Sequence, residues 1–170
     1  MDSDNYSKIN HVYIKDNEVL SMGMVVKLFQ DLSIYELYEI MKIRSSVFVV
    51  EQNCVYQDLD DKDKLAYHVF LKEDEGIQAY LRVLPKDISF EDVSIGRVLT
   101  IKRGQGLGYK ILLEGIKVAK DRLKADKIKI EAQLYAKEFY ERVGFKQISD
   151  DFLEDGIPHI LMELCDITNN

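Results

Sequence analysis

The stretch Arg103-Gly104-Gln105-Gly106-Leu107-Gly108 stands between a predicted strand at residues 93–101 and a long predicted helix that follows at once. Glycines let the backbone turn tightly and leave no side chain between its N–H groups and a ligand. The helix adds unpaired N–H groups and the positive end of its dipole. Lys102 and Lys110 add positive charge to that of Arg103 in a chain whose net charge is -7. The stretch therefore predicts a phosphate-binding turn.

The spacing of its glycines excludes two common phosphate-binding motifs. A Walker A loop requires Lys-Ser/Thr directly after its last glycine, and none follows Gly106. A dinucleotide-binding fingerprint requires a third glycine where this chain has Tyr109. A nucleotide-binding protein is therefore disfavoured. The spacing that does match is R-x-x-G-x-G, formed by Arg103, Gly106 and Gly108.

Hydrophobic periodicity on both sides of the turn predicts a mixed sheet. The predicted strands cover residues 24–29, 65–71, 77–84, 93–101, 128–132, 145–148 and 157–164. Three consecutive strands before the turn predict antiparallel pairing, and the strand–helix–strand unit around it predicts one parallel pair. The fold class is therefore α+β: a mostly antiparallel sheet of about seven strands flanked by helices, in the order β-α-β-β-β-α-β-α-β-β.

Three helices are predicted between these strands. The first begins at a capping box, Ser33 with Glu36. Its apolar face consists of Leu37, Ile40, Met41 and Val47. The second helix carries an apolar stripe of Leu112, Ile116, Ala119 and Leu123. The third covers about residues 136–143 and ends at Gly144, because glycine is best suited to a left-handed C-cap.

Length and composition predict one domain at residues 24–170, preceded by a polar leader at 1–23 that contains a candidate extra strand at 11–14. Nucleic-acid binding is not expected, because a net charge of -7 is opposite to what phosphate neutralisation requires. No apolar run approaches the ~20 residues that span a bilayer, so no membrane association is expected. The polar start and two isolated cysteines indicate the reducing cytoplasm.

A second block, A-K-E-F-Y-E-R-V-G-F at residues 136–145, lies one helix and one strand after the glycine turn. The two blocks together resemble the GCN5-related N-acetyltransferase (GNAT) family, which has R-x-x-G-x-G at its pyrophosphate site and a later A-x-x-F-Y-x-x-x-G-F element. Residues 44–54, 56–58, 95–98 and 155–160 resemble the ElaA-like subgroup of that family. The resemblance covers about residues 32–164 and implies the GNAT fold.

The resemblance implies direct attack of a neutral amine on acetyl-coenzyme A, without an acyl-enzyme. It implies that backbone groups of Val98, Leu99 and Thr100 pair with the pantetheine arm, and that the Leu99 N–H polarises the thioester carbonyl. Tyr140 falls on the family's general-acid position, and a phenol with pKa ~10 is protonated at neutral pH. The implied pyrophosphate site is Arg103, Gly104, Gln105, Gly106, Leu107 and Gly108, and Ala136 and Phe139 line the cofactor channel.

The general base stays open at this point. Glu131 and His159 are the first candidates, and Glu51, His68 or a water chain are alternatives. Structural roles compete with the catalytic ones: Glu131 is expected to face solvent on an alternating strand, and His68 to be a hydrogen-bonded core histidine. Phe139 and Tyr140 also fit core aromatics of an amphipathic helix.

No metal site is predicted. The acidic run Asp58-Asp60-Asp61-Asp63 lacks the glycine and glutamate that a calcium loop requires at its sixth and twelfth positions. It is interpreted as a solvated loop. Cys54 has no evident histidine partner and is interpreted as a small buried residue.

Two functions remain. The first is an acetyl-CoA-dependent N-acetyltransferase acting on a small-molecule or peptide amine, as a monomer or a homodimer. The second is a non-catalytic acyl-CoA-binding or regulatory module of the same fold, against which the tyrosine at position 140 counts mildly.

Overall fold

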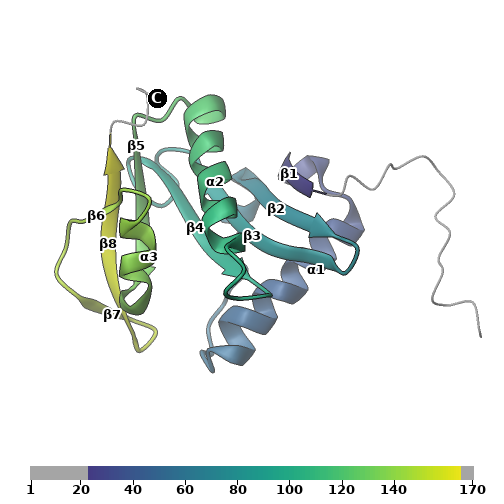
Figure 1. The fold of residues 1–170 in the computed structure, drawn as a ribbon, viewed down its shortest axis with the longest axis horizontal. Coiled ribbons are helices and arrows are strands. Elements are labelled where there is room, and N and C mark those ends of the chain that lie inside the picture. The colour runs from purple at the N-terminus through teal and green to yellow at the C-terminus, as the bar shows by residue number, and fades with distance from the viewer. Residues whose placement is uncertain (1–22, 166–170) are drawn as a thin grey trace, which may run out of the picture.

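A computed structural model describes residues 23–165, whose strands form one eight-stranded mixed sheet (Figure 1). The strand order is β1-β2-β3-β4-β5-β8-β6, with β7 paired to β8. The strands are β1 (Gly23–Leu28), β2 (Tyr67–Glu73), β3 (Gly76–Leu84), β4 (Val93–Thr100), β5 (Lys127–Gln133), β6 (Lys146–Gln147), β7 (Phe152–Glu154) and β8 (Ile157–Cys165). The predicted leader strand at residues 11–14 lies outside the described residues.

The pairing confirms the predicted mixed sheet. β4 and β5 are parallel, and the other neighbouring pairs are antiparallel. The parallel pair results from the crossover through the long helix, since a strand–helix–strand unit returns in the same direction. The α+β fold class predicted from the order of elements is therefore confirmed.

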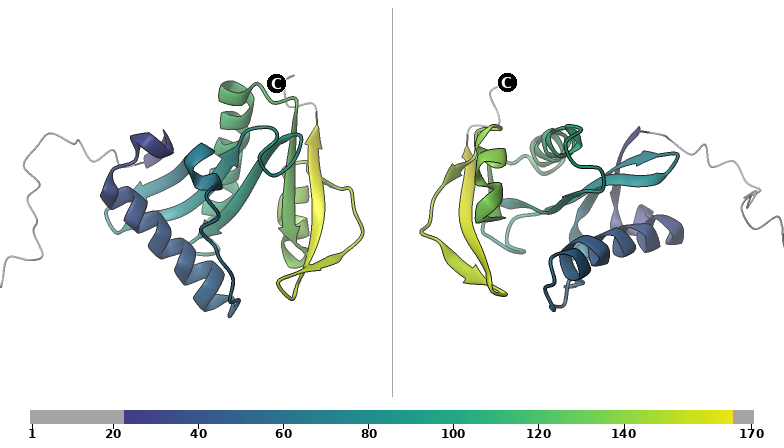
Figure 2. Two further views of the ribbon diagram at one scale, coloured as in Figure 1. Left: turned by 180° about the vertical axis from the view of Figure 1, so that it is seen from behind. Right: turned by 60° about the horizontal axis from the view of Figure 1, so that its bottom comes forward.

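Helices cover both faces of this sheet (Figure 2). They are α1 (Ile34–Arg44), α2 (Leu107–Leu123) and α3 (Lys137–Glu141). A π-helical segment, Ser45–Glu51, continues α1, and single 3-10 turns occupy Phe29–Asp31, Lys62–Leu65 and Leu134–Ala136. α1 packs on one face with β1, β2 and β3, while α2 and α3 pack on the other. The predicted third helix is shorter than expected, and Gly144 follows it at φ 103°.

The start of α1 confirms the predicted capping box. The Glu36 N–H donates to Ser33 Oγ at 3.2 Å, and the Ser33 N–H donates to the Glu36 carboxylate at 2.8 Å. The predicted apolar face is only half right. Ile40 and Val47 are buried, but Ile43 joins them in place of Leu37 and Met41, which are partly exposed. The buried side of the helix therefore differs from the predicted one, and it also contains the charged residues Glu36 and Arg44.

The other face of the sheet holds the larger core. Ile111 and Leu112 of α2 are fully buried against β3 and β4, and each such side chain contributes about 1.5–3 kcal/mol. Gly115 lets the helix approach the sheet closely, since a Cβ there would lie 2.8 Å from a methyl group of Leu81. This contact sets how closely the middle of α2 packs on β3.

The acidic loop is only partly solvated, so the prediction was right for the exposed Asp61 and wrong for two other carboxylates. Asp58 and Asp63 are buried because three arginines from the helix and the strands neutralise them. Arg44 donates to Asp58 at 2.9 Å and to Asp63 at 2.6 Å. Arg82 bonds Asp60 and Asp63 at 2.6 and 2.9 Å, and Arg97 donates to Asp58 at 2.6 Å. We call these six residues the Arg–Asp network.

The charges of this network lower the pKa values of two of its carboxyl groups, those of Asp60 and Asp63. Burial by itself would raise the pKa of Asp60, but the hydrogen bonds and charge of Arg82 outweigh it and lower that pKa to about 2. Burial opposes the same effect at Asp63, where Arg44 and Arg82 hold the pKa below its usual value. Asp60 and Asp63 therefore stay ionised at neutral pH. The ion pairs of Arg44 with Asp58 and Asp63 tie α1 to the loop that packs on the sheet.

The eighth strand, β7, was not predicted. It pairs with β8 through a two-residue turn, Asp155-Gly156, in which both residues have positive φ, 49° and 79°. Asp-Gly between two extended runs is the sequence signal for such a hairpin.

Candidate active site

The site begins where β4 and β5 separate. These strands pair only at Val93–Ile128 and Ser94–Lys129, so the rest of β4 lacks a partner strand on that side among the described residues. A cleft of about 760 Å³ opens there. Its walls come from β3, β4, β5, α3, the β7–β8 hairpin and the segment after α1. The predicted pantetheine strand, Val98–Thr100, therefore borders an open cleft with backbone groups available for pairing.

A β-bulge shapes this stretch of β4. Tyr80 is opposite Leu99, but Arg82 is opposite Gly96, so β4 has one residue more than β3 between these pairs. Arg97 lies in the bulge at φ 55°. Its guanidinium is held by Asp58 and lies over the rings of Phe48 and Tyr56 at 5.9 and 5.5 Å. The Arg–Asp network thus anchors the bulge, and the bulge sets how the following residues line the cleft.

The glycine turn lies at one end of the cleft, which Arg103 and Gly108 line. Gly104 and Gly106 have φ of 76° and 74°, a region that side-chain-bearing residues rarely adopt. Gly106 is also the N-cap of the 17-residue α2, and no side chain caps its first N–H groups. These exposed N–H groups form a fitting cradle for an anion such as the pyrophosphate of coenzyme A.

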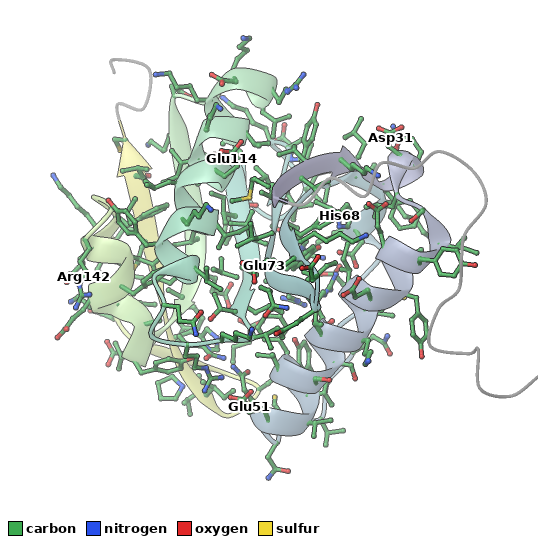
Figure 3. All side chains as sticks on the ribbon, turned by 45° about the vertical axis from the view of Figure 1, so that its right-hand side comes forward. Asp31, Glu51, His68, Glu73, Glu114 and Arg142 are labelled. Carbon is green, nitrogen blue, oxygen red and sulfur yellow. The ribbon has the colours of Figure 1, made fainter. Side chains whose placement is uncertain are left out.

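Arg103 makes an ion pair with Glu51, and both side chains are exposed. Figure 3 shows Glu51 at the end of the helical segment that follows α1. The predicted phosphate-binding arginine is therefore already paired with a carboxylate of this chain, and a phosphate would compete with that carboxylate.

Tyr140 and Phe139 come from α3 and line the cleft. Tyr140 makes edge contacts with Phe139 and Phe145, with ring centroids 5.0 and 5.9 Å apart. Burial, and to a smaller degree Tyr135, raises the pKa of Tyr140 above its ordinary value. Its phenol is therefore protonated at neutral pH, which is the state a proton donor requires. The contacts of Phe139 extend to Gly108, whose added Cβ would lie 3.5 Å from the ring.

Another part of the lining is acidic. Glu131, Glu154 and His159 place one ligand-type atom each within 4.8 Å of the others. The His159 Nδ1 lies 2.8 Å from the carbonyl oxygen of Ile157. Because a carbonyl only accepts, Nδ1 carries the proton in the neutral ring and Nε2 keeps its lone pair. The three side chains suit proton acceptance and are also of the types that bind divalent cations.

Glu154 is the site residue that sequence reasoning missed. It lies on β7, so it meets Glu131 and His159 only through the unpredicted hairpin. Glu131 is exposed, as expected for its strand, and yet it faces the cleft. The sequence therefore indicated Glu131 and His159 as candidates, but it did not indicate that their side chains lie close together.

Comparison with known proteins agrees with this geometry. Residues 36–165 match the family described as "Acetyltransferase (GNAT) domain". The chain belongs to the GNAT family. A UPF0039 protein of Schizosaccharomyces pombe is 38% identical over 148 residues, covering 85% of this chain and 97% of the relative. The protein ElaA of Escherichia coli is 35% identical over 136 residues, covering 78% of this chain and 89% of ElaA.

Solved structures give the same answer for this GNAT chain. An acyl-CoA N-acyltransferase from Pseudomonas aeruginosa superposes with a TM-score of 0.77 at 34% identity, covering 82% of this chain and 97% of the other. The crystal structure of Escherichia coli ElaA has a TM-score of 0.77 at 32% identity, with coverage of 82% and 97%. The ElaA-like resemblance is thereby confirmed, and membership of this acyltransferase family supports acyl transfer in general. None of the helices within residues 23–165 is long and apolar enough to cross a bilayer.

The remaining candidates in this GNAT protein lie apart from the chemistry. His68 is buried between Tyr80 and the Asp63 carbonyl, with both ring nitrogens in contacts of 2.9 Å, and burial lowers its pKa. Figure 3 shows it among the side chains between α1 and the sheet. It is the core histidine that the sequence allowed for. Cys54 is buried as predicted, with its Sγ 3.8 Å from the Asp155 carbonyl oxygen.

Proposed function

We propose that this protein is an acetyl-CoA-dependent N-acetyltransferase that acetylates an amine by direct attack. The observation that carries the proposal is the continuity of one cleft. It joins the unpaired stretch of β4, the glycine turn, Tyr140 and the group formed by Glu131, Glu154 and His159. The family description supports acetyl as the transferred group.

In this proposal, the cofactor enters at the glycine turn. The pyrophosphate accepts hydrogen bonds from the first N–H groups of α2 and from Arg103, which leaves Glu51. The pantetheine arm runs along β4 and pairs with Val98, Leu99 and Thr100 as an additional strand would. Ala136 and Phe139 border the arm on the side of α3, since both line the same cleft.

The chemistry follows from the groups that border the thioester. The Leu99 N–H donates to the thioester oxygen as negative charge develops there, a contribution typically of about 2.7–4 kcal/mol to the barrier. The neutral amine attacks the carbonyl carbon and the C–S bond breaks. Tyr140 donates its proton to the departing thiolate. His159 Nε2 or Glu131 takes the proton that the amine loses, and Glu154 beside them stabilises a protonated imidazole.

Thiol release tests this proposal. The protein is mixed with acetyl-, propionyl- or butanoyl-CoA and an amine panel of polyamines, amino acids, aminoglycosides and peptides. Tyr140→Phe should lower kcat about 10²- to 10⁴-fold with little change in CoA affinity, because only the proton donor is lost. The control is Tyr38→Phe, since Tyr38 is exposed on α1 and does not line the cleft.

Three results would count against the proposal. Undiminished release by Tyr140→Phe would remove that residue from the general-acid role. CoA affinity unchanged in both Arg103→Ala and Gly106→Val would remove the phosphate assignment. CoA binding without thiol release on any amine would favour the non-catalytic module.

A further inference from the structure

The cleft continues past the bulge of β4, away from the glycine turn, to a hollow over Gly96. Gly96 lies opposite Arg82 in the β3–β4 register, and Ser94 lies opposite Leu84. Because alternate residues of a strand share a face, the side chains of Arg82 and Ser94 flank Gly96 on one face. A Cβ added to Gly96 would meet nothing within 4 Å. Arg82, Ser94 and Gly96 all line the cleft.

Two buried polar atoms at this hollow have no partner in the described part of the chain. They are Arg82 Nε and Ser94 Oγ, on residues that are each 3% exposed. The Nη atoms of Arg82 are occupied, with contacts of 2.6 Å to both carboxylate oxygens of Asp60 and 2.9 Å to Asp63. More than nine in ten buried polar groups in folded proteins are hydrogen-bonded. The two orphaned atoms therefore indicate a ligand that completes them.

The chemistry of the two atoms defines that ligand. Arg82 Nε–H can only donate, and the Ser94 hydroxyl can donate to the same atom, so the complement is an oxygen with two lone pairs. A carboxylate fits poorly, because Asp58, Asp60 and Asp63 already match the charges of Arg44, Arg82 and Arg97. An apolar acyl chain would leave the Arg82 Nε–H and the Ser94 hydroxyl without a hydrogen-bond acceptor. A carbonyl or hydroxyl oxygen satisfies both.

We propose that the hollow over Gly96 is a specificity subsite for the acceptor amine, which it binds through a carbonyl or hydroxyl oxygen. This inference rests on the proposed function, in which the cofactor reaches Leu99 from the glycine turn and leaves the opposite end of the cleft to the acceptor. From Leu99 to Gly96 the strand advances roughly 7–10 Å. The oxygen therefore lies about five to eight bonds from the attacking nitrogen, at roughly 1.3 Å per bond.

Calorimetric titration onto protein saturated with CoA tests the subsite without turnover. The probes are ω-amino primary amides with about three to five methylene groups between the amine and the amide, and primary alkylamines of the same length. Wild type should bind the amides about three- to tenfold more tightly, the range expected from one or two neutral hydrogen bonds. Ser94→Ala should lower this preference, because only the Arg82 Nε–H is then left to donate to the amide oxygen. Ser89→Ala is the control, because Ser89 lines the same cleft but is exposed and contacts Lys62 at 2.9 Å.

A second measurement separates recognition from a structural role. Without ligand, Ser94→Ala should have a Tm equal to or above that of the wild type, because no hydrogen bond is lost. A Tm lower by more than about 4 °C would show that the hydroxyl stabilises the fold and would overturn the subsite. Gly96→Val should fill the hollow and remove the amide preference while CoA affinity is retained.

The outcomes distinguish this inference from the proposed function. If CoA itself does not bind, the proposed function fails and the subsite falls with it. If CoA binds but wild type shows equal affinity for amides and alkylamines, or no affinity for either, only the subsite is refuted. A preference that is undiminished in Ser94→Ala also refutes it.

Discussion

Replacing Arg44 by methionine tests whether the Arg–Asp network stabilises the fold. Arg44 is 1% exposed and makes three contacts, at 2.9 Å to Asp58, 2.6 Å to Asp63 and 3.0 Å to the Asp58 carbonyl. Removing one partner from a buried ion pair typically costs about 3–5 kcal/mol. After the change, Asp58 keeps Arg97 and Asp63 keeps Arg82. We therefore expect the low end, about 3 kcal/mol.

This loss corresponds to a Tm lower by about 6–12 °C, since about 2–4 °C accompanies each kcal/mol in a domain of this size. Urea denaturation at pH 7 measures the free energy of unfolding. Lys64→Met is the control, because the Lys64–Asp61 pair lies in the same loop with side chains 63% and 86% exposed. It should change the free energy of unfolding by less than about 1 kcal/mol.

The pH dependence of the Arg44→Met effect provides a further check. Without Arg44 the ionised carboxylate of Asp63 is less stabilised, so it takes up a proton at a higher pH than in wild type. The difference in unfolding free energy between wild type and variant should therefore shrink as pH falls from 7 towards 3. A loss below about 1 kcal/mol at pH 7, or a difference independent of pH, would refute the role given to the network.

Two further predictions concern the cofactor site and acid stability. Glu51→Gln should raise CoA affinity about two- to fivefold, because it releases Arg103 from its ion pair. The same change should have no effect in an Arg103→Ala background. Glu141→Gln is the control, because the side chain of Glu141 is 44% exposed and that of Glu51 is 47% exposed. Weaker CoA binding by Glu51→Gln would contradict the idea that Glu51 competes with the CoA pyrophosphate for Arg103. The free energy of unfolding should fall in two stages as pH is lowered, measured by urea titration. The first stage begins below about pH 6.5, where His68 binds a proton in the unfolded chain. In the folded protein burial lowers the pKa of His68, so it stays neutral there and the unfolded state is favoured. The second begins below about pH 4, because Asp60 has a folded pKa of about 2 and loses its stabilising ionised state as pH falls towards that value. Constant stability between pH 7 and 3 would contradict both.

Several features of this protein could be predicted from the sequence because they depend on neighbours along the chain. The Ser33–Glu36 capping box closes within one helical turn. The glycine turn needs only the left-handed φ values of Gly104 and Gly106 and the start of a helix. The alternation of apolar and polar residues in the strands, together with the order of elements, was enough to predict a mixed sheet with one parallel pair. The β7 hairpin also had a local signal in Asp155-Gly156, which went unused.

Tertiary structure decided the features that depend on distant segments meeting. The sequence around Asp58 and Asp63 is typical of a solvated loop. Their burial depends on ion pairs with Arg44 and Arg82 from other elements, because a buried carboxylate requires a partner charge. The separation of β4 from β5, which opens the cleft, is visible only in the pairing of the two strands, at Val93–Ile128 and Ser94–Lys129. The orphaned atoms at Gly96 likewise follow from the β3–β4 register. Chain neighbours thus determined the elements, and non-local charge pairing and register determined the site.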